Sequence, residues 1–295
     1  MANNEIIDHY KVKEDAHLLE ALQTMYRGRS KSSIKKLLAS GMVLVNGEST
    51  KDAVGKVTTG SVITIAKAPK AVLKANMYLS PIFEDDHIIV INKMPGVNTN
   101  AINKFDTNSV FHILRNYMQQ SNPNNKIFIV HRLDKDTSGI LVFAKSLRIR
   151  EALQEKWHDK KRMYIAVVEG EVIKEKGSIT SWLTETKELK MISSQVRGHG
   201  KEAVTRFEVL QQNELYSLLQ IEILTGRKNQ IRVHMQDLGH PVAGDEKYGA
   251  VNNPLKRLCL HAQLLEFDHP VSGERMKFES EAPAGFDKLT RPKQQ

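Results

Sequence analysis

A short polar stretch between two apolar runs holds the residues of this sequence that are best placed for chemistry. It reads IVHRLDKDTSGILVFAKS, so that one apolar run ends at Val130 and another begins after Gly139. Asp134 lies between them, in a turn that two strands would hold rigid, and such a turn is a suitable place for a reactive carboxylate. The same pattern fits a structural turn whose acids hydrogen-bond the local backbone. Position alone leaves both interpretations of Asp134 open.

The sequence lacks the patterns that mark other familiar reaction centres. The 11 histidines form no HExxH or similarly close spacing, and there is no CxxC pair, so we expect no metal site. There is no G-x-S-x-G turn for a serine nucleophile and no glycine-rich phosphate loop. The single cysteine, Cys259, excludes an intrachain disulfide and fits a reducing compartment, where we expect it to be a small buried apolar residue.

Charge and hydropathy narrow the class of partner. The 295 residues carry a net charge of +9, and such an excess of Lys and Arg favours polyanionic partners because it releases counterions from phosphates. The first ten residues lack the apolar core of a secretory signal, and no stretch approaches the ~20 apolar residues of a spanning helix. We therefore expect a cytoplasmic protein that does not enter a membrane.

The elements that must position these residues fall into two parts. Residues 1–74 read as a small α+β unit with a linker, since the Ala- and Lys-rich stretch 66–80 shows little periodicity. Residues 75–295 alternate apolar runs with two amphipathic helices, at 107–120 and 148–159, and lack a regular βαβ order. We therefore predict an α+β fold with a mixed, mainly antiparallel sheet. Its strands are expected at 87–92, 127–131, 139–146, 163–170, 203–210 and 218–224.

The first part contains a basic helix. Residues 1–76 hold 12 Lys and Arg against seven Asp and Glu, and the run 29–36 has four cations and no acid. The stretch 21–41 predicts two helices, the second capped by Ser30 or Ser32 and stopped at Gly41, followed by a hairpin turn at Asn46-Gly47. A basic helix alone most often forms only a solvated face. The order of elements over residues 15–66, however, resembles the alpha-L RNA-binding fold, which implies that RNA contacts Arg29, Lys31, Ser32, Lys35 and Lys36.

The polar stretch around Asp134 also resembles a known family. HRLDKDTSG is very similar to the signature loop of the RluA-type pseudouridine synthases, and further segments are similar to other motifs of that family in the same order. The resemblance spans residues 80–287. The further segments are EDDHIIVINKMPG at 84–96, KRMYIAVVEG at 161–170, LTGRKNQIRVHMQDLGHPVAGDEKYG at 224–249 and RLCLHAQLLEFDHPVSGERMKFESEAPAGF at 257–286.

The resemblance implies a reaction in which uracil is detached from its sugar, turned and rejoined through carbon 5. No redox change and no addition of water occur, so no cofactor is implied. Asp134 would be the nucleophile or the base that starts an elimination; the residues leave open whether it attacks the anomeric carbon, attacks the ring or removes the neighbouring sugar proton. Tyr164 would stack on the target base and help remove the carbon 5 proton. A structured RNA hides its uridines, so the target must be flipped out, and Arg132 would hold or replace it.

A dry site opposes the ionisation of a carboxylate, so Asp134 needs a cationic partner. The resemblance assigns this role to Arg232, with Arg227 as the second choice. We expect QIRVHM to be a strand that places Gln230, Arg232 and His234 on one face. Ile231 and Val233, on its other face, would form either an apolar wall of the pocket or plain core.

The sequence departs from the family pattern at two places. Asn229 stands where a histidine is common, and Met94 separates Lys93 from Pro95. We expect these changes to affect RNA positioning and substrate choice more than chemistry.

Taken together, the residues predict a monomeric pseudouridine synthase that acts on ribosomal RNA rather than tRNA. Two other interpretations remain. A non-catalytic RNA-binding protein, acting in ribosome assembly or regulation, would not need to retain Asp134, Tyr164 and Arg232 together. A nucleoside hydrolase would need a second carboxylate or a metal to activate water, and the sequence shows neither.

Overall fold

The computed structural model describes residues 6–39, 41–66, 73–101 and 108–292. The chain divides into two compact units, of which the first contains residues 1–73 with 114–126 and the second contains residues 74–113 with 127–295. The boundary expected after residue 74 differs from this division by one residue. The grouping of residues 114–126 with the first unit was not expected.

The smaller unit packs two helices against a four-stranded sheet with the order β1-β6-β3-β4. Helix α2 begins after Ser30, whose hydroxyl accepts a hydrogen bond from the backbone N of Ser33 at 3.2 Å, so the expected cap is confirmed for Ser30. Ile34 and Leu38 lie one turn apart and are buried in the core, which leaves the cationic positions of the helix exposed. The elements are β1 (Ile6–Lys11), β2 (Ala16–His17), α1 (Leu18–Met25), α2 (Lys31–Ala39), β3 (Val43–Val45), β4 (Glu48–Ser49), β5 (Lys56–Val57) and β6 (Val62–Ala66).

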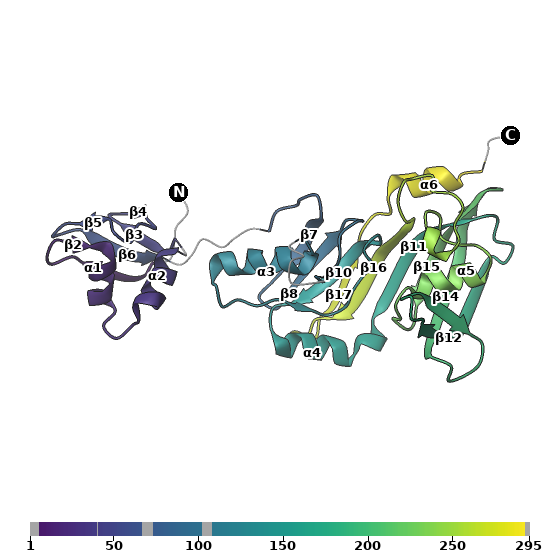
Figure 1. Ribbon diagram of the computed structural model, residues 1–295, viewed down its shortest axis with the longest axis horizontal. Helices are drawn as coiled ribbons and strands as arrows, with labels where there is room; N and C mark the ends of the chain where they lie inside the picture. Colours follow the sequence, from purple (N-terminus) through teal and green to yellow (C-terminus); the bar gives the residue numbers. More distant parts are fainter. Residues whose placement is uncertain (1–5, 40, 67–72, 102–107, 293–295) are drawn as a thin grey trace. The chain divides into compact units, whose positions relative to one another are not determined.

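The larger unit is built on an 11-stranded sheet with the main order β13-β12-β14-β15-β11-β16-β10-β8-β7, to which β17 and β9 add at β16 and β10 (Figure 1). Strands β10 and β16 are parallel, and the other strand pairs of this sheet in the described residues are antiparallel. The expected mixed, mainly antiparallel α+β fold is confirmed. The strands are β7 (Leu79–Glu84), β8 (Ile88–Lys93), β9 (Phe128–Ile129), β10 (Ser138–Ala144), β11 (Lys161–Glu169), β12 (Lys176–Glu185), β13 (Met191–Ser194), β14 (Lys201–Gln212), β15 (Tyr216–Ile223), β16 (Leu260–Asp268) and β17 (Arg275–Glu279).

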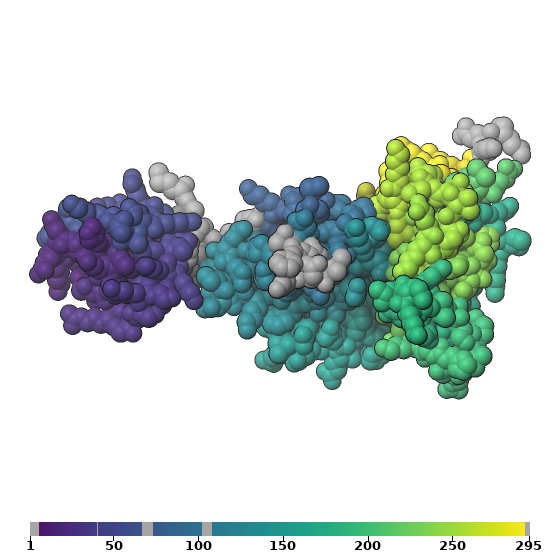
Figure 2. All heavy atoms as spheres, in the orientation of Figure 1, coloured from purple at the N-terminus to yellow at the C-terminus, as the bar shows by residue number. Residues whose placement is uncertain are grey.

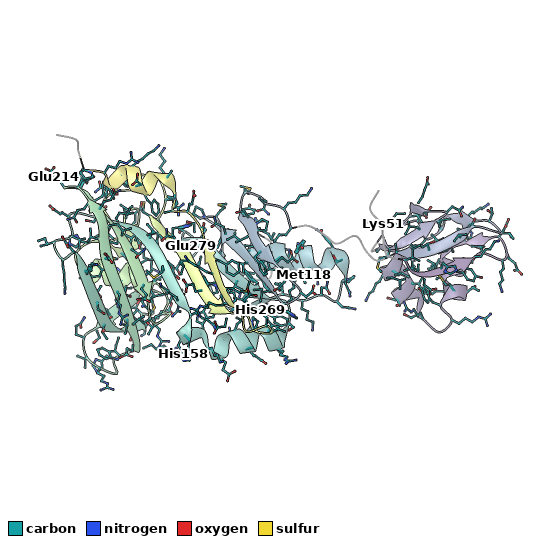
Figure 3. The ribbon with its side chains drawn as sticks, turned by 180° about the vertical axis from the view of Figure 1, so that it is seen from behind. Lys51, Met118, His158, Glu214, His269 and Glu279 are labelled. Atoms are coloured by element: carbon teal, nitrogen blue, oxygen red, sulfur yellow. The ribbon has the colours of Figure 1, made fainter. Side chains whose placement is uncertain are left out.

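Helices cover different parts of this sheet. Helix α4 (Leu147–Glu155) packs on β9 and β10, whereas α5 (Gln230–Asp237) packs on β13 and β14 and α6 (Ala284–Thr290) on β11 and β15 (Figure 1). Helix α3 (Val110–Ser121) lies between β8 and β9 in sequence, and short 3-10 turns occur at Trp157–Asp159 and Glu246–Tyr248. The first of these turns exposes His158, as the view from behind shows (Figure 3).

Most elements expected from apolar runs are present. The runs at 87–92, 139–146, 163–170, 203–210 and 218–224 lie mainly within β8, β10, β11, β14 and β15, and the expected helices overlap α3 and α4. The expected linker at 66–80 lies partly outside the described residues, at 67–72.

The strand expected for QIRVHM was wrong, because these residues begin helix α5. The alternation that predicted a strand contains two polar residues, Gln230 and His234, that are themselves buried. They lie one helical turn apart and both bond the hydroxyl of Thr205 on β14, at 3.0 Å from Gln230 Nε2 and 2.8 Å from His234 Nδ1. Polar residues that face the core through hydrogen bonds give a misleading hydropathy pattern.

Candidate active site

The loop that carries Asp134 joins β9 to β10, and Gly139 fixes its exit. Gly139 has a φ of +117°, and a Cβ on it would lie 2.2 Å from the carbonyl oxygen of Ala262. Only glycine permits β10 to approach the parallel strand β16 this closely. The chain therefore passes from the loop into the sheet at a defined point, through the buried residues Thr137 and Ser138.

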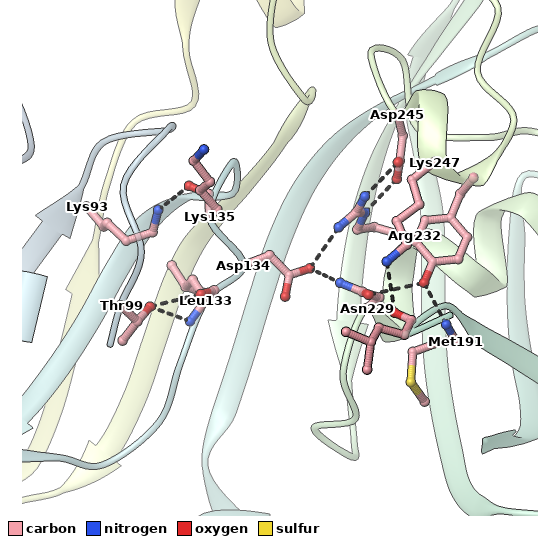
Figure 4. A network of polar contacts seen from close by, with 12 residues as sticks. Lys93, Thr99, Leu133, Asp134, Lys135, Met191, Asn229, Arg232, Asp245 and Lys247 are labelled. Atoms are coloured by element: carbon pink, nitrogen blue, oxygen red, sulfur yellow. Dashed lines mark hydrogen bonds and ion pairs between the residues drawn. The ribbon is translucent and has the colours of Figure 1, made fainter. Parts of the chain in front are cut away.

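The backbone is held on both sides of Asp134. Thr99, which is 3% exposed, donates its hydroxyl to the carbonyl of Leu133 at 2.8 Å and accepts from the N–H of Leu133 at 3.1 Å. On the other side, the Lys93 ammonium donates to the carbonyl of Lys135 at 2.8 Å (Figure 4). A side chain on a loop clamped at both neighbours can be held in one orientation.

Lys93 is fully buried and donates to two further carbonyls, those of Met94 at 3.0 Å and Val97 at 2.9 Å. Burial lowers the pKa of Lys93 to about 7, although the charges of Asp136 and Asp134 favour its protonated form. Three carbonyl acceptors match the three N–H donors of an ammonium group. The residue thus ties the segment 93–97 to the loop of Asp134.

Two side chains donate to the same oxygen of Asp134. The Asn229 amide nitrogen lies 2.5 Å from Oδ2, and NH1 of Arg232 lies 3.3 Å from that atom. In the described residues, no hydrogen bond reaches Oδ1. The departure at Asn229 was expected to affect RNA positioning and substrate choice more than chemistry, and its effect stays a prediction; the structure places its side chain in contact with Asp134. The substitution of an asparagine for the common histidine lies at the carboxylate itself.

Arg232 is oriented by a second carboxylate. Its Nε and NH2 donate to Asp245 at 2.6 and 2.7 Å, a two-pronged pair with a residue that is 2% exposed. Burial opposes the charge of Arg232, but the hydrogen bonds and charge of Asp245, together with Asp134, raise its pKa. The planar fork of arginine can serve two carboxylates at once. Arg227, the second choice, instead donates its Nε to the carbonyl of Glu202 at 2.8 Å.

The side chain of Tyr164 lines the same site as Asp134 and extends from a strand in the middle of the sheet. It lies on β11 at a point where the register with β16 shifts between Met163 and Tyr164, and such an irregularity re-aims a side chain. Tyr164 is 9% exposed. Burial raises its pKa to about 12, against the charge of Arg162, so its hydroxyl stays protonated near neutral pH.

A cavity of about 70 Å³ brings most of the expected residues of the larger unit together. Val233 is not in its lining; it packs with Leu183, Met191, Ala203 and Tyr248 in a separate apolar cluster. The expected residues that line the cavity are Arg132, Asp134, Tyr164, Arg227, Ile231 and Arg232. Their roles in catalysis and binding stay predictions.

A wider groove of about 520 Å³ adjoins this cavity and shares Arg232 with it. Its lining includes Lys247, Lys256 and Arg257 but also the acids Asp136 and Glu246. Figure 2 shows this side of the larger unit, where the yellow-green segment near residue 250 borders blue-green segments from earlier in the chain.

The expected RNA-binding residues of the smaller unit lie on and just before α2. All five are exposed, and the Arg29 guanidinium lies 4.4 Å from the ring centroid of Tyr26. They are Arg29, Lys31, Ser32, Lys35 and Lys36. Their contact with RNA stays a prediction.

The described residues contain neither a candidate metal site nor a candidate membrane span. Within the described ranges, no three His, Cys, Asp or Glu side chains are grouped so that they could hold a metal ion. In the same part of the chain, no helix has the length and apolar character needed to cross a membrane.

Comparison with known proteins gives consistent matches. A family model described as RNA pseudouridylate synthase matches residues 87–237. The chain is 37% identical over 218 residues to the uncharacterized RNA pseudouridine synthase YhcT of Bacillus subtilis, with 72% of each chain covered. It is 32% identical to an uncharacterized RNA pseudouridine synthase of Aquifex aeolicus, in a match that covers 97% of this chain and 96% of the relative.

A third relative carries a more specific name. Ribosomal large subunit pseudouridine synthase D of Borreliella burgdorferi is 37% identical, over 72% of this chain and 68% of its own length. Among solved structures, human RNA pseudouridylate synthase domain containing 4 superposes with a TM-score of 0.58 at 22% identity, covering 70% of this chain and 89% of the human one. The structural likeness shows a shared fold.

Proposed function

The chain belongs to the RNA pseudouridylate synthase family, and on this premise we propose that it converts uridines of ribosomal RNA to pseudouridine with Asp134 as its nucleophile. The family relation makes it an RNA pseudouridine synthase, an isomerase. The ribosomal target is supported by relatives named as modifiers of the large ribosomal subunit. A cytoplasmic location follows from such a substrate.

The observation that carries the proposal is the ion pair of Asp134 and Arg232 beside the ring of Tyr164. In the reaction the bond from uracil N1 to the anomeric carbon breaks, and the electron pair leaves with the base. The base turns, a bond forms from carbon 5 to the same sugar carbon, the carbon 5 proton departs and N1 takes up a proton, so that the product is an isomer and no cofactor is needed. A carboxylate can begin this sequence as a nucleophile, and the guanidinium of Arg232 lies beside it at 3.3 Å.

The size of the cavity supports base flipping. At about 70 Å³ it is far smaller than the ~300 Å³ or more of a site that encloses a whole drug-sized ligand. We therefore expect the base of an extruded nucleotide to enter and its sugar and phosphate to stay outside. Exposed Arg132, in the cavity lining, would hold the nucleotide or fill its place in the RNA.

Tyr164 would act through its ring. A buried aromatic face beside the reacting carboxylate suits stacking on a uracil. Removal of the carbon 5 proton by its oxygen would require a phenolate, which the raised pKa of Tyr164 disfavours.

Two basic surfaces would contact the RNA backbone. One is the groove that Arg232 shares with the cavity, where Lys247, Lys256 and Arg257 outnumber the acids in the lining. The other is exposed helix α2 of the smaller unit. Phosphate contacts of this kind supply affinity and position the RNA without reading its sequence.

The alternative is an RNA-binding protein of this family that has lost catalysis. To separate the two, pseudouridines are mapped in ribosomal RNA and tRNA of cells with and without the gene, and of cells that carry only Asp134→Asn. We expect one or more ribosomal sites to revert to uridine in both the deletion and the variant. An unchanged map in the deletion strain contradicts the proposal, and sites lost only from tRNA would correct the substrate.

A further inference from the structure

A series of hydrogen bonds between buried polar groups connects edge strand β13 to Asp134. The backbone N of Met191 donates to the hydroxyl of Tyr248 at 3.1 Å, and that hydroxyl donates to Oδ1 of Asn229 at 3.1 Å. The Asn229 amide nitrogen then donates to Oδ2 of Asp134 at 2.5 Å (Figure 4). Tyr248 and Met191 have no place in the chemistry described so far.

The hydrogen bonds of this series can run in only one direction from donor to acceptor. A backbone N–H can only donate, so the Tyr248 oxygen accepts from Met191 and its single proton is free for Asn229. Because Oδ1 of Asn229 receives that proton, the amide nitrogen must face Asp134. Burial raises the pKa of Tyr248, so the proton that sets this direction is retained over the working range of pH. An amide rotated the other way would place its oxygen against the carboxylate oxygen of Asp134.

Tyr248 and Asn229 are both held in place, the first by packing and the second by its backbone conformation. Tyr248 is 0% exposed and packs among Leu183, Met191, Ala203 and Val233, while the Arg232 guanidinium lies 4.9 Å from its ring centroid. Asn229 precedes α5 with a φ of +53°, a left-handed conformation that asparagine adopts more readily than most residues. The backbone of Asn229 is thus fixed by the start of the helix and its side chain by Tyr248.

The two carboxylate oxygens of Asp134 differ in the hydrogen bonds that they accept. Asn229 and Arg232 both donate to Oδ2, whereas Oδ1 receives no hydrogen bond within the part of the chain that the structure describes. Rotation of the carboxylate about its Cβ–Cγ bond would exchange the two oxygens. Two donors fixed on the same oxygen oppose that rotation and leave the lone pairs of Oδ1 available.

We propose that Tyr248 and Asn229 are positioning residues that hold Oδ2 of Asp134 and thereby make Oδ1 the oxygen that reacts with the nucleotide. Tyr248 acts only through Asn229, and Asn229 acts only through Asp134. The inference rests on the proposed function of Asp134 and deepens it by naming the reacting atom and the residues that select it.

The test is the single-turnover rate of tritium release from unmodified ribosomal RNA labelled at carbon 5 of uridine, with full-length protein. Asn229→Gly removes the donor and leaves the left-handed backbone unstrained. We expect it to slow release about 100-fold, the scale of a misplaced reacting group, and Tyr248→Phe to slow it about tenfold. The RNA dissociation constant should stay within about twofold of the native value, because both residues act through Asp134 rather than on the RNA.

Two further variants separate positioning from a merely structural role. Asn229→His supplies a ring N–H from a residue that tolerates this backbone, so release should recover to within about tenfold of the native rate. The double variant Asn229→Gly with Tyr248→Phe should be no slower than Asn229→Gly alone, since Tyr248 acts through the removed amide. Tyr216→Phe, at another buried tyrosine, is the matched control and should leave the rate unchanged.

The outcomes are distinct. The positioning role is overturned if the effects of the two substitutions multiply in the double variant, or if Asn229→Gly releases tritium at the native rate. In either case Asp134→Asn would still abolish release, so the proposed function would stand. Full release by Asp134→Asn overturns the proposed function instead. Melting temperatures measured for each variant ensure that every rate is recorded on folded protein.

Discussion

Asp245 accepts two hydrogen bonds from Arg232, at 2.6 Å from Nε and 2.7 Å from NH2, and this pair aims the remaining nitrogen at Asp134. The guanidinium therefore bridges a buried carboxylate that orients it and a more accessible one that we assign to chemistry. A lysine could supply the charge but not the planar fork that serves both partners.

We accordingly predict that Arg232→Lys slows tritium release about 100-fold or more while the RNA dissociation constant changes little. Single-turnover kinetics with labelled RNA measure the first quantity and filter binding the second. Arg206→Lys is the matched control, since Arg206 forms an exposed ion pair with Glu222 and should tolerate the change. A variant Arg232→Lys with native kinetics would show that charge alone suffices.

The clamp on the loop gives a second prediction. Thr99→Val keeps the shape of the side chain but removes both hydrogen bonds to Leu133, so we expect a loss of about 1–3 kcal/mol of unfolding free energy and a slower reaction. Thr290→Val, at another buried threonine, should lower stability similarly and leave the rate unchanged. Urea unfolding and tritium release measured side by side test this; equal rates in the two variants would mean that the clamp does not position Asp134.

Much of the site could be predicted from the sequence because its residues lie in short, recognisable segments. HRLDKDTSG located Asp134 between two apolar strands, and the positions of Tyr164 and Arg232 followed from the resemblance of neighbouring segments. The structure places these three residues around one cavity.

The remaining contacts could not be predicted, because they depend on which buried polar groups meet in three dimensions. Gln230 and His234 face the core through Thr205, so the alternation around Arg232 indicated a strand where the chain forms a helix. The contact of Asn229 with Asp134 joins residues 95 positions apart and left no pattern in the sequence.

Buried histidines predict how stability depends on pH. Burial lowers the pKa of His234 to about 4, below the value of about 6.5 for an unfolded histidine. Between these values the unfolded chain binds more protons, so the unfolding free energy falls as the pH drops from 6.5 toward 4. His131 and His261, with pKa values lowered by burial to about 3 and about 4, act in the same direction.

We expect His234→Asn to reduce this slope by up to about 1.4 kcal/mol per pH unit, since asparagine does not titrate. Urea unfolding at several pH values gives the slope, and His158→Asn, at an exposed histidine, is the control. Parallel slopes for the native protein and His234→Asn would contradict the assignment of a neutral buried imidazole.

The exposed cations of α2 predict a salt effect. Lys35→Glu with Lys36→Glu should weaken RNA binding and reduce the slope of log affinity against log salt by about 1–2, as one or two phosphate contacts are lost. Lys174→Glu with Lys288→Glu makes the same change in charge on exposed positions of the larger unit and should have a smaller effect. If the slope is unchanged, α2 is only a solvated face.

The central claim is that Asp134 reacts, and Asp134→Asn tests it with almost no change in shape. The measurement is tritium release from ribosomal RNA labelled at carbon 5 of uridine, with Asp86→Asn, an exposed acid outside the linings of the cavity and the groove, as the control. We predict that Asp134→Asn binds RNA like the native protein and releases tritium at least about 1,000-fold more slowly, whereas Asp86→Asn stays active. Release by Asp134→Asn at the native rate would contradict the account.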